Sequence, residues 1–405
     1  MKFTILKKCW ICLFIFCLIL LGGCNTVKRY EDTSVIKEDL SRQAADIELY
    51  VLDEIKSGKY EPDTGIYTGA YVQKDENIAG DIAKYEALIG QEQTFKVFNY
   101  KASEGITKQD ILKCIAQKKI PYIKIILSTD YDLTTLYQLI FDLKDSYRTP
   151  VFIELYPLTE KSYSPIKYRE TYQRAYEILH KYLEDIVVVW SSDDTRMEDI
   201  SLYYPGDPYA DWVGINIYIP RYKQDMPYNY TTLHHLDYWY KTFQSKKPML
   251  ISGLAISHFS KVDHSYTVQD TISKLTLFYQ DALEQYPRIK GIIYMDVNMA
   301  NISQNGKEDY EITRHHQIVE AMKALSLPLN IRQRLMETDK EQTCYQKYSV
   351  DAIYYENQLY IPQEYMSVCF NKVPLRKIRH IEDLSGKVYY AYDDIKSYCT
   401  TFYME

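Results

Sequence analysis

The sequence lacks the features that mark a nucleic-acid-binding protein. It has no basic run longer than two or three residues, and its formal net charge is −7. Binding to nucleic acid requires clustered Lys and Arg that neutralise phosphates, so this class of partner is excluded. Hydrophobic residues make up 46% of the 405 residues and charged residues 25%, a composition that allows one large globular domain and a small one.

Several catalytic and cofactor motifs are also absent. The sequence contains neither GxSxG, the nucleophile motif of many serine hydrolases, nor the phosphate-binding loop GxxxxGK[ST]. The pairs His234-His235 and His315-His316 lack the spacing of metal ligands, and we interpret them as solvated residues. The sequence therefore predicts no cofactor and no metal ion.

The N-terminus predicts export from the cytoplasm. Lys2, Lys7 and Lys8 precede the apolar run CWICLFIFCLILLGG, which has the length of a secretory signal and is short for a membrane-spanning helix. The run ends in LLGGC, which resembles the lipobox of bacterial lipoproteins. The resemblance implies a signal peptide over residues 1–24 and a lipid on Cys24 that holds the protein at the extracytoplasmic face of a bacterial cell membrane. The alternative is an uncleaved anchor helix, which places the domain on the same side.

Five cysteines remain once the residues before Cys24 are removed: Cys24, Cys114, Cys344, Cys369 and Cys399. No CxxC pair remains among them, and no Cys/His cluster has the spacing of a zinc site. Cys369 and Cys399 either pair in an oxidising exterior or stay as two reduced thiols, and the sequence leaves both alternatives open.

Residues 25–62 are expected to form a tether followed by a docking helix. Ile36, Leu40, Ile47, Val51 and Ile55 are separated by three, four or seven residues, which is the spacing of one helix face.

From residue 63 to residue 325, short apolar segments alternate with amphipathic ones. Eight predicted strands, among them PYIKIIL, PVFIELY and IKGIIYMDV, alternate with helical stretches such as SPIKYRETYQRAYEILHKYL. This number and order of elements predict an α/β fold of the (β/α)8 TIM-barrel type. An open doubly wound sheet is the alternative, but no glycine-rich loop follows the first strand.

The residues after the predicted barrel divide into a connector, 326–340, and a small α+β C-terminal module, 341–405. The module contains a short repeat, because YIPQEYMSVC (360–369) matches YAYDDIKSYC (390–399) in its Tyr, acidic, Ser and Cys positions. It resembles the copper-amine-oxidase-like N-terminal modules of bacterial surface proteins, which are not known as copper sites. A chance match within a tyrosine-rich tail is the alternative.

The segment YYPGDPYADWVGINIY (203–218) joins a Pro-Gly-Asp turn to a buried strand, with VVVWSS (187–192) before it and KPMLIS (247–252) after it. The order and spacing of these motifs resemble the glycoside hydrolases of family 26, whose best-known members are β-mannanases. The resemblance covers residues 63–325 and implies a TIM barrel with a sugar cleft at the C-terminal ends of its strands. The general rule for such barrels places the cleft at the same end.

The catalytic residues of that family do not align with acidic residues here. The family uses a retaining mechanism, which needs two carboxylates about 5–5.5 Å apart. The resemblance places the acid/base at Pro157 or, in a shifted register, at Leu158, and neither has a proton to give. Glu160, in the following loop, is the alternative acid, or else a solvated charge.

The nucleophile position is occupied by Gly253, in the register that Lys247-Pro248 fixes. A glycine cannot form a glycosyl-enzyme, although it can allow the backbone to approach a ligand closely. Asp296 is the other candidate for a displaced catalytic carboxylate.

Aromatic and amide residues at the strand ends are the predicted ligand contacts. Trp190, Tyr218 and Tyr294 are predicted to stack on sugar rings, and the first two match family positions. Asn216, Asp296 and Asn298 are predicted to bind hydroxyl groups. Alternate residues on a barrel strand face in and out, so some of these residues will face away from a ligand. Asp193 and Asp194 are expected to cap a helix.

Three functions are compatible with these observations. The first is a surface-anchored, non-hydrolytic protein that binds a polysaccharide, such as a mannan, or another cell-envelope component. The second is an active endo-β-mannanase-like hydrolase whose carboxylates are displaced, with Glu160 and Asp296 as the candidates. The third is a structural envelope scaffold.

Overall fold

The computed structural model describes residues 34–35, 44–100, 106–125, 133–144, 149–155, 164–194, 200–230, 233–336, 341–370, 373–398 and 401–404. The chain divides into two compact units, Leu52–Lys347 and Met1–Val51 with Tyr348–Glu405. They are described in turn. Within the described ranges, no helix is both long enough and apolar enough to cross a membrane.

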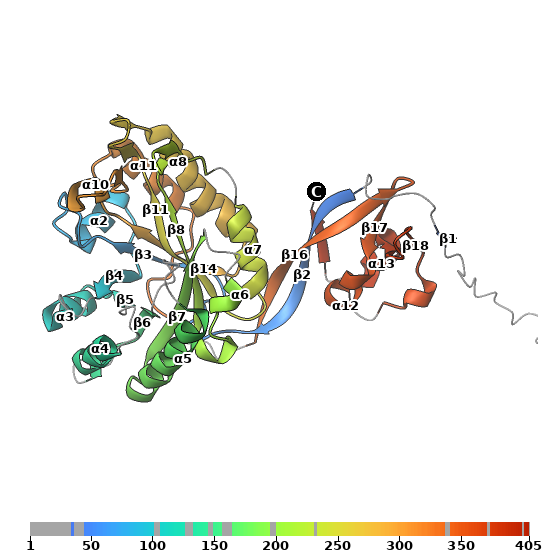
Figure 1. Ribbon diagram of the computed structural model, residues 1–405, viewed down its shortest axis with the longest axis horizontal. Coiled ribbons are helices and arrows are strands. Elements are labelled where there is room, and N and C mark those ends of the chain that lie inside the picture. The colour runs from blue at the N-terminus through green and yellow to red at the C-terminus, as the bar shows by residue number, and fades with distance from the viewer. Residues whose placement is uncertain are drawn as a thin grey trace, which may run out of the picture. The chain divides into compact units, whose positions relative to one another are not determined.

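The larger unit contains a closed barrel of eight parallel strands, which confirms the predicted TIM-barrel fold (Figure 1). Each strand pairs with the next one along the chain, and the last pairs with the first. The strands are β3 (Tyr67–Tyr71), β4 (Phe95–Tyr100), β5 (Ile120–Ile125), β6 (Val151–Leu155), β7 (Ile186–Asp193), β8 (Trp212–Ile219), β11 (Met249–Ile256) and β14 (Ile289–Met295).

Helices follow most of the strands and cover the barrel on its outside, as α3, α4 and α5 show in Figure 1. In α5 the buried residues Tyr168, Tyr172, Ala175 and Leu179 are four, three and four apart, so they share the face that packs on the barrel. The helices are α2 (Ile82–Ile89), α3 (Lys108–Ala116), α4 (Thr134–Lys144), α5 (Pro165–Tyr182), α6 (Ile200–Tyr203), α7 (His234–Phe243), α8 (Val268–Thr276), α9 (Leu283–Gln285), α10 (Met299–Ile302) and α11 (His316–Ser326).

Shorter elements complete this unit. A 3-10 turn, η3 (Asp207–Tyr209), precedes β8, and a π-helical turn, η4 (Leu277–Ala282), joins α8 to α9. The hairpin β9 (Tyr222–Lys223) and β10 (Met226–Pro227) follows β8. A small sheet contains β12 (Phe259–Ser260), β13 (Ser265–Tyr266) and β15 (Glu308–Asp309).

The barrel strands separate two apolar cores. Outward-facing side chains such as Val188 and Ile215 pack against the helices. Inward-facing aromatic side chains fill the N-terminal half of the interior, where Phe95 and Phe152 have ring centroids 4.8 Å apart. The segment that precedes β3 closes this end, because the indole nitrogen of Trp212 donates to the Lys59 carbonyl at 2.7 Å.

The smaller unit is built on a seven-stranded sheet with the order β1-β18-β19-β17-β16-β2-β20. Its strands are β1 (Ser34–Val35), β2 (Ala44–Lys56), β16 (Glu341–Tyr355), β17 (Gln358–Pro362), β18 (His380–Glu382), β19 (Val388–Ala391) and β20 (Thr401–Met404). Strands β2 and β16 extend past the division and have residues in both units.

The short sequence repeat of this unit corresponds to a structural repeat. Strand β17 leads into η5 (Gln363–Tyr365) and α12 (Met366–Cys369), and strand β19 leads into α13 (Tyr392–Ile395) and η7 (Lys396–Tyr398). One further 3-10 turn, η6 (Leu375–Lys377), lies between the two copies. The predicted α+β module of strand, turn and helix is therefore present. Cys369 is buried, and Cys399 lies outside the described residues, so the question of their pairing stays open.

The structure corrects two predicted boundaries. Residues 44–56 form strand β2 instead of the docking helix, because Ile47, Leu49 and Val51 are buried at alternate positions, which is the period of a strand. The predicted connector, 326–340, is not a free linker over its described part. Its Ile331 bridges to Ile66, just before β3, and the Thr94 hydroxyl donates to the Arg332 carbonyl at 2.6 Å.

Candidate functional site

A buried polar network occupies the middle of the barrel interior. Lys124 on β5, Glu154 on β6 and Asn216 on β8 point inward and are almost fully buried. The Lys124 ammonium group lies 3.0 Å from a Glu154 carboxylate oxygen and donates to the Asn216 side-chain oxygen at 2.8 Å. The sequence analysis did not predict this buried ion pair.

Further donors surround the Glu154 carboxylate. The Tyr122 hydroxyl donates to one oxygen at 3.0 Å, and the Ser191 hydroxyl and the Asn216 amide donate to the other at 2.5 and 3.1 Å. Burial, together with the neighbouring Glu154, raises the pKa of the Tyr122 hydroxyl well above its usual value. Donors within the barrel therefore engage both oxygens of the Glu154 carboxylate, and Glu154 does not line the pocket described below.

Gly253 lies beside this network, on β11. A Cβ atom added there would lie 2.5 Å from the side-chain oxygen of Asn216, 3.0 Å from the Tyr218 hydroxyl and 3.1 Å from the Lys124 ammonium group. Network side chains therefore occupy the space that a side chain at position 253 would need. Their proximity also explains the glycine, since a side chain would have to displace Asn216.

A pocket of about 500 Å³ opens beyond the network, at the C-terminal ends of the strands. Tyr71, Asn99, Tyr218, Ala255 and Met295 each occupy the last or next-to-last position of a barrel strand. The other lining residues are Lys74, Val297, Met299, Ile302 and Tyr310. This is the end of a TIM barrel at which ligand sites are found.

Tyr218 connects the pocket to the network, and its role as a ligand contact stays a prediction. Its ring lines the pocket and is 36% exposed, while its hydroxyl donates to the Asn216 side-chain oxygen at 3.3 Å. Asn216 itself is 1% exposed and is fully engaged in the network. Asn216 therefore positions Tyr218 and does not line the pocket.

Two residues predicted to stack on sugar rings face outward from the barrel, toward its helices. Trp190 is fully buried between the barrel and the helices, with the Tyr204 and Phe243 rings at centroid distances of 5.1 and 5.8 Å. Tyr294 is also fully buried in this outer layer, and its hydroxyl donates to the Tyr310 carbonyl at 2.9 Å. Both follow from strand alternation, because Val189 and Ile293 are the inward-facing neighbours.

Asp296 and Asn298 do not line the pocket. They lie behind its wall, which is formed by the neighbouring residues Met295, Val297 and Met299. Asp296 is fully buried, accepts a hydrogen bond from the Ile312 backbone nitrogen at 2.7 Å, and has a pKa raised well above its usual value by burial and by Asp75. Asn298 caps α10 and donates to the Asp309 carboxyl at 2.6 Å. A fully enclosed Asp296 cannot reach a substrate, so the structure contradicts its predicted catalytic role.

The acidic residues near this wall differ from Glu154 in their partners. The Asp309 carboxyl accepts hydrogen bonds from the Asn298 side chain and from the Glu311 backbone nitrogen. Burial is the main reason that the pKa of Asp309 is raised to about 7, and the Glu311 carboxylate contributes. In the part of the chain that the structure describes, no group of three His, Cys, Asp or Glu side chains is arranged to hold a metal ion.

Some predicted residues are not placed. Pro157, Leu158, Glu160 and Cys24 lie outside the described residues. Asp193 ends β7 at the barrel mouth, paired in register with Asn216, and Asp194 is buried beside it.

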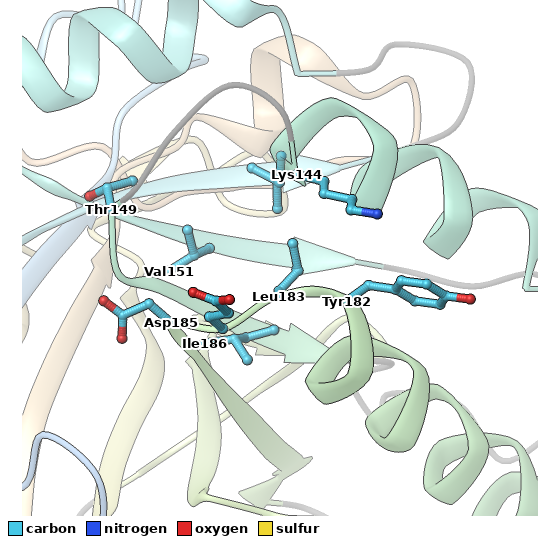
Figure 2. Close-up of a pocket in the computed structure, with 9 residues that line it drawn as sticks. Lys144, Thr149, Val151, Tyr182, Leu183, Asp185 and Ile186 are labelled. Carbon is cyan, nitrogen blue, oxygen red and sulfur yellow. The ribbon is translucent and has the colours of Figure 1, made fainter.

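A second pocket lies at the opposite end of the barrel. Val151 and Ile186 are the first residues of β6 and β7, and Figure 2 shows them with Leu183, Tyr182 and the α4 residue Lys144 around this hollow. Its volume, about 590 Å³, is similar to that of the pocket at the mouth. Residues at the N-terminal face of such barrels serve stability, so we take the pocket at the mouth as the candidate site.

The sequence analysis missed the network and most of the pocket lining. Lys124 and Glu154 had a detectable signal, because each is a single charge inside an otherwise apolar strand, and the two charges have opposite sign on consecutive strands. Lys74, Met299 and Tyr310 come from loops and a short helix, and no periodicity identifies such positions.

The fold and the site define a (β/α)8 barrel with a pocket at its mouth. The family model described as glycosyl hydrolase family 26 matches residues 155–237, a segment that includes β7 and β8. This match and the closed parallel barrel confirm the resemblance to that family. No curated protein matches the chain.

Two solved structures illustrate the similarity in fold. The modular endo-β-1,4-mannanase from Cellulomonas fimi is 10% identical, with a TM-score of 0.50 over 86% of this chain and 99% of that one. GH26C from a Muricauda species is 8% identical, with a TM-score of 0.50 over 68% of this chain and 91% of that one. At this level of identity the likeness concerns the fold alone.

Proposed function

We propose that this chain is a lipid-anchored protein of glycoside-hydrolase fold that binds a polysaccharide at the barrel mouth without hydrolysing it. The observation that carries the proposal is the environment of Gly253. The expected nucleophile is replaced by a glycine, and the space that its side chain would enter is filled by Asn216, Tyr218 and Lys124. A retaining hydrolase needs two carboxylates about 5–5.5 Å apart facing its substrate.

The pocket supports a binding role. Three tyrosines, Tyr71, Tyr218 and Tyr310, are among its lining residues, and none of the described lining residues is acidic. Tyrosine combines an apolar ring with a polar hydroxyl, which suits the faces and edges of a sugar. The volume of about 500 Å³ is in the range of small-ligand sites.

The substrate class and the location follow from different observations. Mannan-type polysaccharides are the first candidates, because the similar Cellulomonas fimi protein is an endo-β-1,4-mannanase. The outer face of the cell membrane follows from the LLGGC motif and a lipid on Cys24.

Binding to a panel of polysaccharides tests the proposal. The purified protein is incubated with insoluble mannan, glucomannan, xylan and mixed-linkage glucan, and the bound fraction is measured. We expect at least one polymer to retain the protein, and Tyr218→Ala to weaken that binding about tenfold, since a ring in the pocket is lost.

Tyr238→Ala is the matched control, because Tyr238 is half-exposed on the outer helix α7 and does not line the pocket. Equal effects of the two substitutions, or no binding to any polymer, would contradict the proposal. An active hydrolase that uses Glu160 would instead cleave one of these polymers.

A further inference from the structure

Two polar residues among the described lining of the pocket at the mouth, Lys74 and Asn99, are candidates for ligand binding. Lys74 follows β3, Asn99 lies near the end of β4, and both line the pocket. Neither side chain has a hydrogen bond or ion pair with another described residue. Lys74 is the one charged residue among the lining residues that the structure describes. An anion in the pocket would therefore have a cation and an amide available to it.

Five of the described lining residues are apolar. Met295 ends β14, Val297 follows it, and Met299 and Ile302 come from α10. Together with Ala255 they give five apolar side chains in a site that also contains three tyrosine rings. Methionine side chains adapt to small apolar groups, and such a wall favours methyl groups over hydroxyls.

The position of this wall is fixed from behind. Asn298 caps α10 and hydrogen-bonds to Asp309, and the neighbouring Tyr310 presents its ring to the pocket while its carbonyl accepts from Tyr294. The apolar groups are therefore held by buried hydrogen bonds, so the wall is preformed.

We propose that the pocket recognises a sugar unit that carries both a carboxylate and a short acyl group. Lys74 and Asn99 would bind the carboxylate, Met295, Val297 and Met299 would contact the acyl methyl group, and the Tyr218 ring would pack on the sugar. This inference rests on the proposed function and names the chemical class of its ligand. It predicts that plain mannan, which carries neither substituent, binds the pocket more weakly than such a sugar.

Four monosaccharides allow the contributions of the carboxylate and the acyl group to affinity to be measured separately. N-acetylmuramic acid carries both, N-acetylglucosamine carries the acyl group, glucuronic acid carries the carboxylate, and glucose carries neither. Dissociation constants are measured for the full-length protein by ligand-observed NMR. We expect N-acetylmuramic acid to bind at least tenfold more tightly than either singly substituted sugar, and glucose to bind most weakly.

Two variants assign the substituents to residues. Lys74→Met should abolish the increase in affinity that the carboxylate gives and leave the increase that the acyl group gives. Lys74→Arg should retain both increases. Met299→Ser should abolish only the increase in affinity that the acyl group gives. Lys84→Met, on an exposed position of α2, is the control and should change nothing.

The outcomes distinguish this inference from the proposed function. Equal affinities for the four sugars, with a polysaccharide still bound through Tyr218, would overturn the inference and leave the proposed function intact. No binding of any sugar or polymer would overturn both. Unchanged sugar preferences in Lys74→Met and Met299→Ser would also overturn the inference.

Discussion

The network and the pocket lie next to each other in the same barrel, yet their polar groups differ in whether other described residues hydrogen-bond to them. In the network, Lys124, Glu154 and Asn216 hydrogen-bond to one another and to Ser191 and Tyr122. In the pocket, Lys74 and Asn99 have no side-chain partner among the described residues. Tyr218 belongs to both regions, with its hydroxyl in one and its ring in the other.

This difference indicates which region can interact with a ligand. A ligand that reached the network would have to break a buried ion pair, and the remaining charge would be costly. The pocket offers Lys74 and Asn99, whose side chains no other described residue engages, so a ligand can bind them by displacing water. The network therefore contributes stability, and under the proposed function recognition is left to the pocket.

The largest effect is expected from breaking the ion pair in the network. Glu154→Gln keeps the shape of the side chain and leaves the Lys124 charge buried without a counter-ion, so we expect a loss of about 3–5 kcal/mol in the free energy of unfolding. Urea denaturation measures it. The double variant Lys124→Met with Glu154→Gln should be more stable than Glu154→Gln alone. If the double variant is less stable, the two charges do not form the coupled pair that the geometry implies.

The second effect concerns the stability contributed by Asp309, a buried carboxyl whose pKa is raised mainly by burial. Because the pKa of Asp309 is raised from 3.8 to about 7, the folded state binds more protons than the unfolded state between these values. Its contribution to stability is complete below about pH 4 and is lost as the pH rises to about 7, a change of up to about 4 kcal/mol.

Asp309→Asn cannot titrate, so its stability should fall less than that of the unmodified protein between pH 4 and pH 7. Urea unfolding of both proteins at several pH values measures the difference. Parallel stability curves for the two proteins would show that Asp309 has an ordinary pKa.

A smaller effect is expected from a side chain at Gly253. Gly253→Ala places a methyl group 2.5 Å from the Asn216 side-chain oxygen, and we expect a loss of about 1–3 kcal/mol from overpacking. Thermal or urea unfolding measures it. Gly253→Glu should remain without hydrolytic activity, because the network occupies the space of the new carboxylate. Hydrolysis restored by that single substitution would contradict this view of the site.

The smallest effect concerns the wall of the pocket. Asn298→Ala removes both the cap of α10 and the hydrogen bond to Asp309, and should lower the free energy of unfolding by about 1 kcal/mol. Asn301→Ala, on the exposed side of α10, is the control. An equal effect of the two substitutions would show that the cap does not hold the wall.

The sequence predicted the barrel correctly, and it placed Tyr218 at the C-terminal end of a barrel strand. Eight apolar strands with intervening amphipathic helices were enough for the fold, and the strand-end position of Tyr218 was enough for its place in the pocket. Trp190 and Tyr294 were mispredicted because strand alternation alone does not say which set of residues faces inward. Residues 44–56 were mispredicted because Ile47, Val51 and Ile55 satisfy a helical spacing while Leu49 completes a strand pattern. The contacts of Asp296 depend on residues far away in the chain, and no local pattern reveals them.

Hydrolysis by the purified protein tests the central claim most directly. The protein is kept for a day at high concentration with mannan, glucomannan, xylan or mixed-linkage glucan, and new reducing ends are measured against a sample without protein. The account predicts no new reducing ends from any polymer, including one that the protein binds. Cleavage that Glu160→Gln abolishes would contradict it, because a displaced catalytic site would then be active beside Gly253.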